Sequence, residues 1–326
     1  MKKVLLAAAL AAATAIAAAQ EPTTSVTLTK VLDIQVDVNN SEAMGSSTYD
    51  PAADKFIVGT RGTGARLQVY NSATGAYETD MSKAGITPGG LGFFGVTAAQ
   101  NGYVYAYEDG GKDIWRWGSI SDSAPQKVYD TAAFARTGYT GTVGNDIVIA
   151  FTGSANKGPV EFFSDSIPFS SSSFTFNESA TLEAKPTVAI NNAGTVAFTT
   201  GDTGLNLVKW TKVDGVWNMG WSVPFGGGPI AYDNTHDVVI GVGRNTNKIT
   251  VFRGSNGNID GQLATTNAMN ATPQCEGGFA VPNATGGRVY LSGPGSVVSP
   301  AGKAVFLVYD YVIPNAAVND WSLYKQ

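Results

Sequence analysis

The residue types that carry most nucleophilic and metal chemistry are scarce in this chain of 326 residues. It has one histidine, His236, and one cysteine, Cys275, which excludes an internal disulfide and any zinc site that needs two ligands of either type. His236 lies in the polar segment Asp233–Asp237, which predicts a turn between two strands rather than a catalytic base. We interpret Cys275 as a sheltered small hydrophobe.

Local catalytic motifs are also missing. Residues Gly90–Gly95 match G-x-G-x-x-G, but a dinucleotide site needs a strand before this segment and a helix after it, and the sequence predicts neither. The G-x-S-x-G, P-loop, H-E-x-x-H and C-x-x-C patterns do not occur. The common hydrolase, nucleotide and zinc chemistries are therefore disfavoured, although a site assembled from distant segments would leave no local motif.

One polar segment, Asn256–Asp260, has the oxygen-bearing side chains that Ca²⁺ prefers. It lacks the bidentate Glu that ends a twelve-residue calcium loop, and a tight turn explains it more simply. No cofactor is predicted, and Ca²⁺ is the one ion that the composition leaves open.

The first nineteen residues have the pattern of a cleaved signal peptide. Lys2 and Lys3 precede an apolar run, Val4–Ala19, that ends in small residues before Gln20. This run is shorter than the roughly 20 residues that span a bilayer, so no membrane span is predicted. Cleavage leaves residues 20–326 as a single domain in a secreted or periplasmic protein of bacterial style.

The charge balance disfavours nucleic acid as a partner. The whole chain has 21 basic and 26 acidic residues, and removal of the two signal lysines changes the net charge from −5 to −7. Only 14% of the residues are charged, against roughly 25% in typical soluble domains. Sheets that are buried on both faces would explain this low fraction.

Two series of short apolar segments recur in step along the chain, and no clean helical period accompanies them. Each segment of one series ends in an aromatic residue, and these residues are 47, 46, 47, 42 and 57 positions apart: Tyr70, Trp117, Phe163, Trp210, Phe252 and Tyr309. Each segment of the other series precedes one of these after a polar turn, and the six begin near Phe56, Tyr103, Ile147, Val196, Val238 and Val289. Two series that keep step predict six copies of one unit.

Each unit has room for four short strands, and the chain therefore resembles the β-propeller superfamily. We predict an all-β fold, a six-bladed β-propeller of four-stranded antiparallel blades. The blades are expected near residues 46–81, 90–130, 137–178, 185–223, 227–266 and 277–314. An N-terminal strand within 26–38 is expected to close the ring as the outer strand of the last blade, and Trp321–Tyr324 compete for the same place.

The resemblance is closest in style to extracytoplasmic propellers of the NHL and lactonase-like kind. The enzymes among them hold a metal at the central channel through acidic and amide side chains, and no such set can be matched to this sequence. The resemblance therefore leaves enzymatic activity uncertain, and we lean against it.

In a propeller, the turns between second and third strands share one face with the links between blades. Much of the sparse charge falls in these segments, and because loops on a rigid scaffold often carry function, we expect the binding surface there. The candidate binding residues are Arg61, Asp109, Lys112, Lys185, Asp202, Arg244 and Glu276.

The predicted function is a secreted binding or scaffold module for an unknown protein, glycan or small molecule. A metal-assisted hydrolase or lactonase at the central channel is the alternative from another class. A surface-layer or matrix component is a further alternative. Oxygen ligands that converge at the channel would favour the enzyme, and a channel lined by glycine and aliphatic residues would favour the binding module.

Overall fold

The structure is a computed structural model. It describes fifteen stretches of the chain: 26–38, 44–62, 64–90, 92–99, 101–108, 113–130, 136–143, 146–152, 159–163, 170–171, 187–200, 206–243, 246–267, 277–294 and 303–314. Among these residues, no helix is long and apolar enough to cross a membrane.

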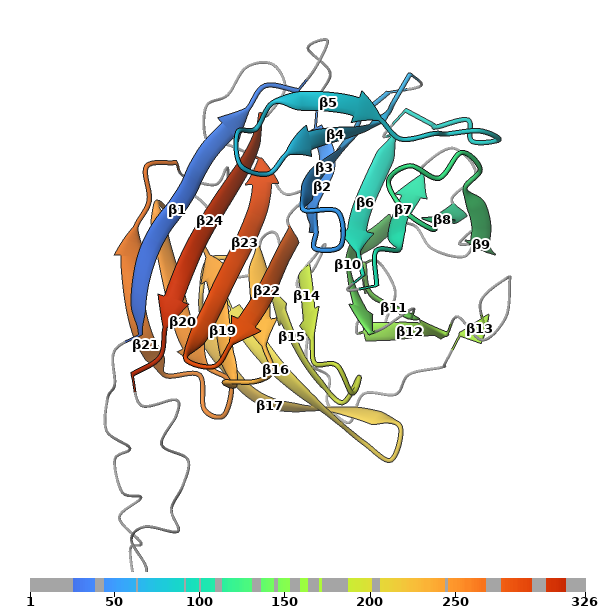
Figure 1. Ribbon diagram of the computed structural model, residues 1–326. Helices are drawn as coiled ribbons and strands as arrows, with labels where there is room; N and C mark the ends of the chain where they lie inside the picture. Colours follow the sequence, from blue (N-terminus) through green and yellow to red (C-terminus); the bar gives the residue numbers. More distant parts are fainter. Residues whose placement is uncertain are drawn as a thin grey trace, which may run out of the picture.

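The described residues form six antiparallel four-stranded sheets, numbered here in chain order (Figure 1). The first sheet contains β2 (Met44–Asp50), β3 (Lys55–Thr60), β4 (Leu67–Asn71) and β5 (Tyr77–Asp80), and the second contains β6 (Phe93–Ala98), β7 (Val104–Glu108), β8 (Asp113–Trp117) and β9 (Gln126–Asp130). The third contains β10 (Arg136–Val143), β11 (Asp146–Thr152), β12 (Pro159–Phe163) and β13 (Ser170–Ser171).

The remaining three sheets follow the same order of strands, except that the last one takes its outer strand from the other end of the chain. The fourth contains β14 (Thr187–Ile190), β15 (Val196–Thr200), β16 (Asn206–Val213) and β17 (Val216–Pro224), and the fifth contains β18 (Ile230–Asp233), β19 (Val238–Val242), β20 (Lys248–Arg253) and β21 (Ile259–Ala264). The sixth contains β22 (Gly277–Asn283), β23 (Gly286–Pro294), β24 (Ala304–Val312) and β1 (Thr27–Val36).

The two predicted series of segments correspond to two strands of each sheet. The segments that end in an aromatic residue are the third strands, as with Tyr70 in β4 and Trp210 in β16. The other series supplies the second strands, as with Phe56 in β3 and Val289 in β23. The predicted all-β propeller of four-stranded antiparallel blades is therefore confirmed at the level of architecture.

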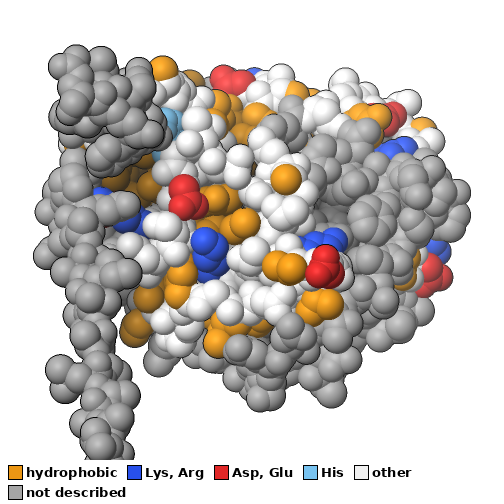
Figure 2. Space-filling view, turned by 90° about the horizontal axis from the view of Figure 1, so that it is seen from below, with side chains coloured by type: hydrophobic (Ala, Val, Ile, Leu, Met, Phe, Trp, Pro, Cys, Tyr) orange, Lys and Arg blue, Asp and Glu red, His pale blue; other side chains and the backbone are white. Residues whose placement is uncertain are grey.

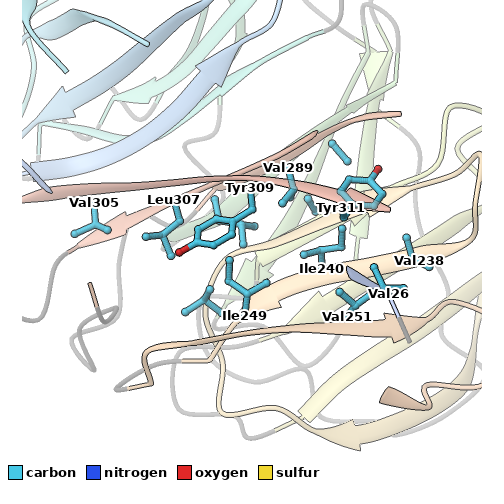
Figure 3. Packing of buried hydrophobic residues seen from close by; sticks show 14 residues of the cluster. Val26, Val238, Ile240, Ile249, Val251, Val289, Val305, Leu307, Tyr309 and Tyr311 are labelled. Atoms are coloured by element: carbon cyan, nitrogen blue, oxygen red, sulfur yellow. The ribbon is translucent and has the colours of Figure 1, made fainter. Parts of the chain in front are cut away.

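Hydrophobic residues fill the spaces between neighbouring sheets. Between the fifth and sixth sheets, Val289, Leu307 and Tyr309 pack on Ile240 and Ile249, and all five are buried (Figure 3). A strand such as β3, which has sheets on both sides, is buried along most of its length. This packing accounts for the small number of charged residues.

The innermost strands lie side by side in the order β2, β6, β10, β14, β18 and β22, and β22 also lies against β2. Glycines allow these strands to approach closely. A Cβ atom on Gly277 would lie 2.7 Å from the carbonyl oxygen of Ser47, and one on Gly278 would overlap the carbonyl oxygen of Ile230. The backbone of β22 is thus packed directly against the backbones of β2 and β18.

The predicted N-terminal strand forms β1, which pairs with β24 from Thr27 opposite Val312 to Val36 opposite Ala304. The outer position in the sixth sheet is therefore occupied by the N-terminal candidate. Its competitor, Trp321–Tyr324, lies outside the described residues.

A carboxylate also joins β1 to the link between the fifth and sixth sheets. Asp33 Oδ2 accepts hydrogen bonds from the backbone N–H of Thr266 at 2.5 Å and from the Thr266 hydroxyl. Its Oδ1 accepts one from the Asn267 amide at 2.9 Å. These bonds hold the outer strand at its middle as well as along its paired edge.

Candidate functional site

The predicted binding face is only partly within the described residues. Arg61 is half-buried in the turn between β3 and β4. Lys83 supports the same turn, because its Nζ donates to the carbonyl oxygen of Ala65 at 3.0 Å. The other six candidates lie outside the described residues, so their grouping with Arg61 stays a prediction: Asp109, Lys112, Lys185, Asp202, Arg244 and Glu276.

Two buried carboxylates flank the loop that contains Asp109 and Lys112. Glu108 at the end of β7 pairs with Asp113 at the start of β8, and both residues are buried. Lys127 Nζ lies 2.8 Å from Asp113 Oδ1 and 3.7 Å from Asp130 Oδ2. The bond that the Lys127 ammonium donates to the Asp113 carboxylate raises the pKa of this ammonium above its ordinary value. This end of the second sheet therefore carries a charged cluster with a fixed geometry.

Sequence reasoning missed Asp113 and Lys127. Both belong to strands whose alternation draws attention to the apolar residues, such as Trp117. A signal was available, because acidic residues bracket the Gly110–Gly111 pair where the chain reverses. Among the described residues, no three His, Cys, Asp or Glu side chains are arranged to hold a metal ion.

His236 lies between β18 and β19, in the turn that the sequence predicts, and its Nδ1 is 2.5 Å from Asp233 Oδ2. Asp233 also accepts bonds from the backbone N–H of Thr235 at 2.8 Å and of His236 at 3.2 Å. A fourth donor, the Tyr311 hydroxyl, reaches it from the sixth sheet at 2.7 Å. The structural interpretation of His236 agrees with these contacts, because they organise a turn and join two sheets.

Burial and the Asp233 carboxylate both raise the pKa of the Tyr311 phenol, and burial is the larger cause. The phenol therefore keeps its proton and acts as a donor to Asp233. A buried carboxylate that accepts several hydrogen bonds is the arrangement in which a charge can be kept inside a protein.

Polar side chains at the ends of the innermost strands accept hydrogen bonds from the backbone of the turns that follow. Asp50 in the first sheet accepts bonds from the backbone N–H of Ala52 at 2.9 Å and Ala53 at 3.3 Å. In the fourth sheet, Asn191 accepts from Thr195 at 2.8 Å and Val196 at 3.0 Å. Burial raises the pKa of the Asp50 carboxyl, and the two backbone bonds oppose this effect. These side chains serve the local backbone rather than a ligand.

Two other motifs from the sequence have structural roles. Gly90 and Gly92 precede β6, and Gly95 lies within it. Gly92 has a φ of 66°, and a Cβ atom there would lie 2.8 Å from the Cα of Arg61. Asn256 Oδ1 accepts from the N–H of Asn258 at 2.9 Å, which confirms the predicted tight turn, and Asp260 Oδ2 accepts from Arg253 Nε at 2.5 Å. Cys275 lies outside the described residues.

Charged side chains of both signs are scattered among hydrophobic and uncharged ones on the face seen in Figure 2. They do not gather into a single-sign patch among the coloured residues of that view.

Comparison with known proteins supports the fold class alone. No family model matches the sequence, and no curated protein matches it. Among solved structures, the chain is similar to the β-propeller domain of Cps50 (Swd1) from Myceliophteria thermophila, with a TM-score of 0.53 and 7% sequence identity. The match covers 87% of this chain and 99% of that domain. The fold is therefore a β-propeller.

Proposed function

We propose that the chain is an extracytoplasmic binding module whose rigid propeller presents the loops around Arg61 to a protein, glycan or small molecule. The observation that supports this most directly is the packing at the centre, where Gly277 and Gly278 bring β22 into backbone contact with β2 and β18. These strands pack too closely to accept additional Cβ atoms, whereas the surface loops are the parts that are free to vary.

We also propose that the six sheets form a closed ring of six blades. Contacts between the first and sixth sheets support this closure: the rings of Tyr49 and Tyr290 stack with centroids 3.5 Å apart, and those of Phe56 and Phe306 stack at 3.9 Å. In a closed ring the Arg61 face is continuous around the axis. A more specific likeness to NHL or lactonase-like propellers has no support beyond the resemblance in the sequence.

The location outside the cytoplasm rests on the signal-like segment 1–19. Expression of the whole chain in a bacterium, followed by N-terminal sequencing of the exported fraction, tests it. We expect a mature chain that begins at Gln20. Retention of uncleaved protein in the cytoplasm would contradict the proposal.

The binding function is tested with two matched variants of the mature chain. The first replaces Arg61, Lys185, Arg244 and Glu276 with alanine on the proposed face. The second replaces Lys55 and Glu78, which form an ion pair of 2.8 Å at the hairpins of the first sheet, on the opposite face. Partners are captured from the extracellular fraction of the organism that makes the protein and are identified by cross-linking.

We expect captured partners to cross-link to the Arg61 face, to be lost with the first variant and to be kept by the second. Loss with the second variant alone would overturn the assignment of the face. Turnover of a lactone or ester panel by the mature chain would instead favour the hydrolase.

A further inference from the structure

The sixth sheet has an exposed area on the face that it turns toward the first sheet, which we call the sixth-sheet overhang. It is centred on Val281 in β22 and Val312 in β24, which are 41% and 49% exposed. Between them Arg288 pairs with Asp310 through two bonds, at 2.6 and 3.0 Å. The register places Val281 opposite Arg288, Arg288 opposite Asp310, and Asp310 opposite Thr29, so these side chains share one face.

The overhang exists because the first sheet ends too early to cover it. The last contacts from the first sheet are those of Tyr49, which stacks on Tyr290, and of Gly75, which packs against Ile34. Beyond Tyr290 the strands of the sixth sheet continue for two more rows of side chains, to Gly286 opposite Val312. Figure 1 shows β1, β24 and β23 as long neighbouring strands.

The other face of the same rows is covered. Tyr311 donates to Asp233 of the fifth sheet, and Val26 packs in the cluster between these two sheets. One side of the sheet end is therefore buried and the other side exposes valines. The two valines lie on either side of the Arg288–Asp310 pair, and another segment that crosses this pair can cover both.

The segment that follows β24 begins at this surface. Val312 belongs to the overhang, and the N–H of Ile313 donates to the carbonyl oxygen of Thr285 at 2.9 Å, which keeps the chain beside the turn between β22 and β23. Twelve residues follow Pro314 in the sequence, and they can extend for at most about 40 Å. They contain the apolar group Trp321, Leu323 and Tyr324.

The outer edge of the sixth sheet is not available to these apolar residues. That edge is occupied by β1, which is paired with β24 along its length. Large apolar side chains gain free energy when they leave water, and the nearest exposed apolar residues along the chain are Val312 and, on the same sheet face, Val281.

We propose that residues 315–326 dock on the sixth-sheet overhang, with the apolar group at 321–324 covering Val281 and Val312. The Arg288–Asp310 pair lies between these two valines, at the centre of the contact. The docked segment covers the part of the sheet that the first sheet leaves open. The proposal is independent of the binding function and does not involve the Arg61 face.

The test measures acrylamide quenching of Trp321 in the mature chain, taken as the difference in fluorescence between each protein and its own Trp321→Phe counterpart. The test variant combines Val281→Glu with Val312→Glu, and both positions are exposed enough to accept the change. The control is Val213→Glu, at a valine of the fourth sheet that is 54% exposed. A synthetic peptide of residues 315–326 gives the quenching constant of the free segment.

We expect a quenching constant several-fold below that of the peptide in the parent and in the control, and one equal to the peptide in the double variant. Peptide-like quenching in the parent would overturn the proposal, and so would unchanged protection in the double variant. Protection that disappears on dilution, together with a dimer in sedimentation, would also overturn it, because a second copy would then be the occupant.

Discussion

The hydroxyl of Tyr311 donates a hydrogen bond of 2.7 Å to the carboxylate of Asp233 and so joins the sixth sheet to the fifth. Asp233 is buried and binds His236 and two backbone N–H groups at the same time. The contact connects residues 78 positions apart in the sequence. It lies beside the cluster of apolar residues that packs between these two sheets.

Replacing Tyr311 with Phe should lower the free energy of unfolding by about 1–3 kcal/mol, because a buried carboxylate loses one of its donors while the ring packing is kept. Urea denaturation at neutral pH measures the change. The control is Tyr77→Phe, at a tyrosine that is 41% exposed, where little change is expected. Equal stability of Tyr311→Phe and the parent would show that Asp233 is satisfied without the phenol.

Asp50 gives a prediction with a defined pH dependence. Burial raises its pKa in the folded chain, so near pH 4 the folded chain binds more protons than the unfolded chain. Stability therefore falls as the pH rises from the unfolded pKa through the folded pKa, and the penalty is fully present at neutral pH.

Asp50→Asn should remove this penalty and still accept the bonds from Ala52 and Ala53, as Asn71 Oδ1 accepts from the N–H groups two and three residues on. We expect the variant to be at least as stable as the parent at pH 7, with a difference that shrinks below about pH 4. Thermal unfolding across this range measures it, with Asp214→Asn in an exposed hairpin as the control. A variant that is less stable at every pH would refute the prediction.

Asp33→Ala should weaken the attachment of the outer strand β1. The change leaves the N–H and hydroxyl of Thr266 and the amide of Asn267 without their acceptor. We expect a loss of about 1–3 kcal/mol and faster proteolysis of β1. Asp37→Ala, at a side chain that is 76% exposed, is the matched control. Similar cleavage rates in both variants would argue against a holding role for Asp33.

Gly278→Ala should prevent normal assembly of the innermost strands, because the added Cβ would overlap the carbonyl oxygen of Ile230. The loss should reach several kcal/mol or abolish soluble expression, because the obstacle is backbone rather than a movable side chain. Gly90→Ala, where no atom lies within 4 Å of the new Cβ, tests the general effect of the substitution. Circular dichroism and melting temperature distinguish the two, and a native-like Gly278→Ala would contradict the close approach.

The repeated pattern of the sequence was enough to predict the propeller architecture and its four-stranded blades. Aromatic residues such as Tyr70 and Trp210 recur because the third strands β4 and β16 each contribute a large ring to a space between sheets, so the period of the packing is visible in the chain. The N-terminal strand was also predictable, because its apolar residues alternate and it has no adjacent partner.

The contacts between sheets were not predictable in the same way. Tyr49 stacks on Tyr290, and Tyr311 donates to Asp233, but the sequence around these residues does not indicate which residue each one contacts. Which side chains meet across two sheets depends on the twist and register of both. The candidate site was also only partly predictable. Only Arg61 among its seven residues is within the described structure. The charged pair of Asp113 and Lys127 was missed because both residues lie in strands rather than in loops.

The pairing of Thr27 with Val312 sets the order in which the molecule can be completed. The outer strand of the sixth sheet is among the first parts of the domain to leave the ribosome, and its partner β24 is among the last. Until β24 has been synthesised, β1 has no edge to pair with, and five sheets can form while the sixth must wait. A chain interrupted before residue 304 would expose the unpaired edges of both β1 and β23, which are sites for association with other chains.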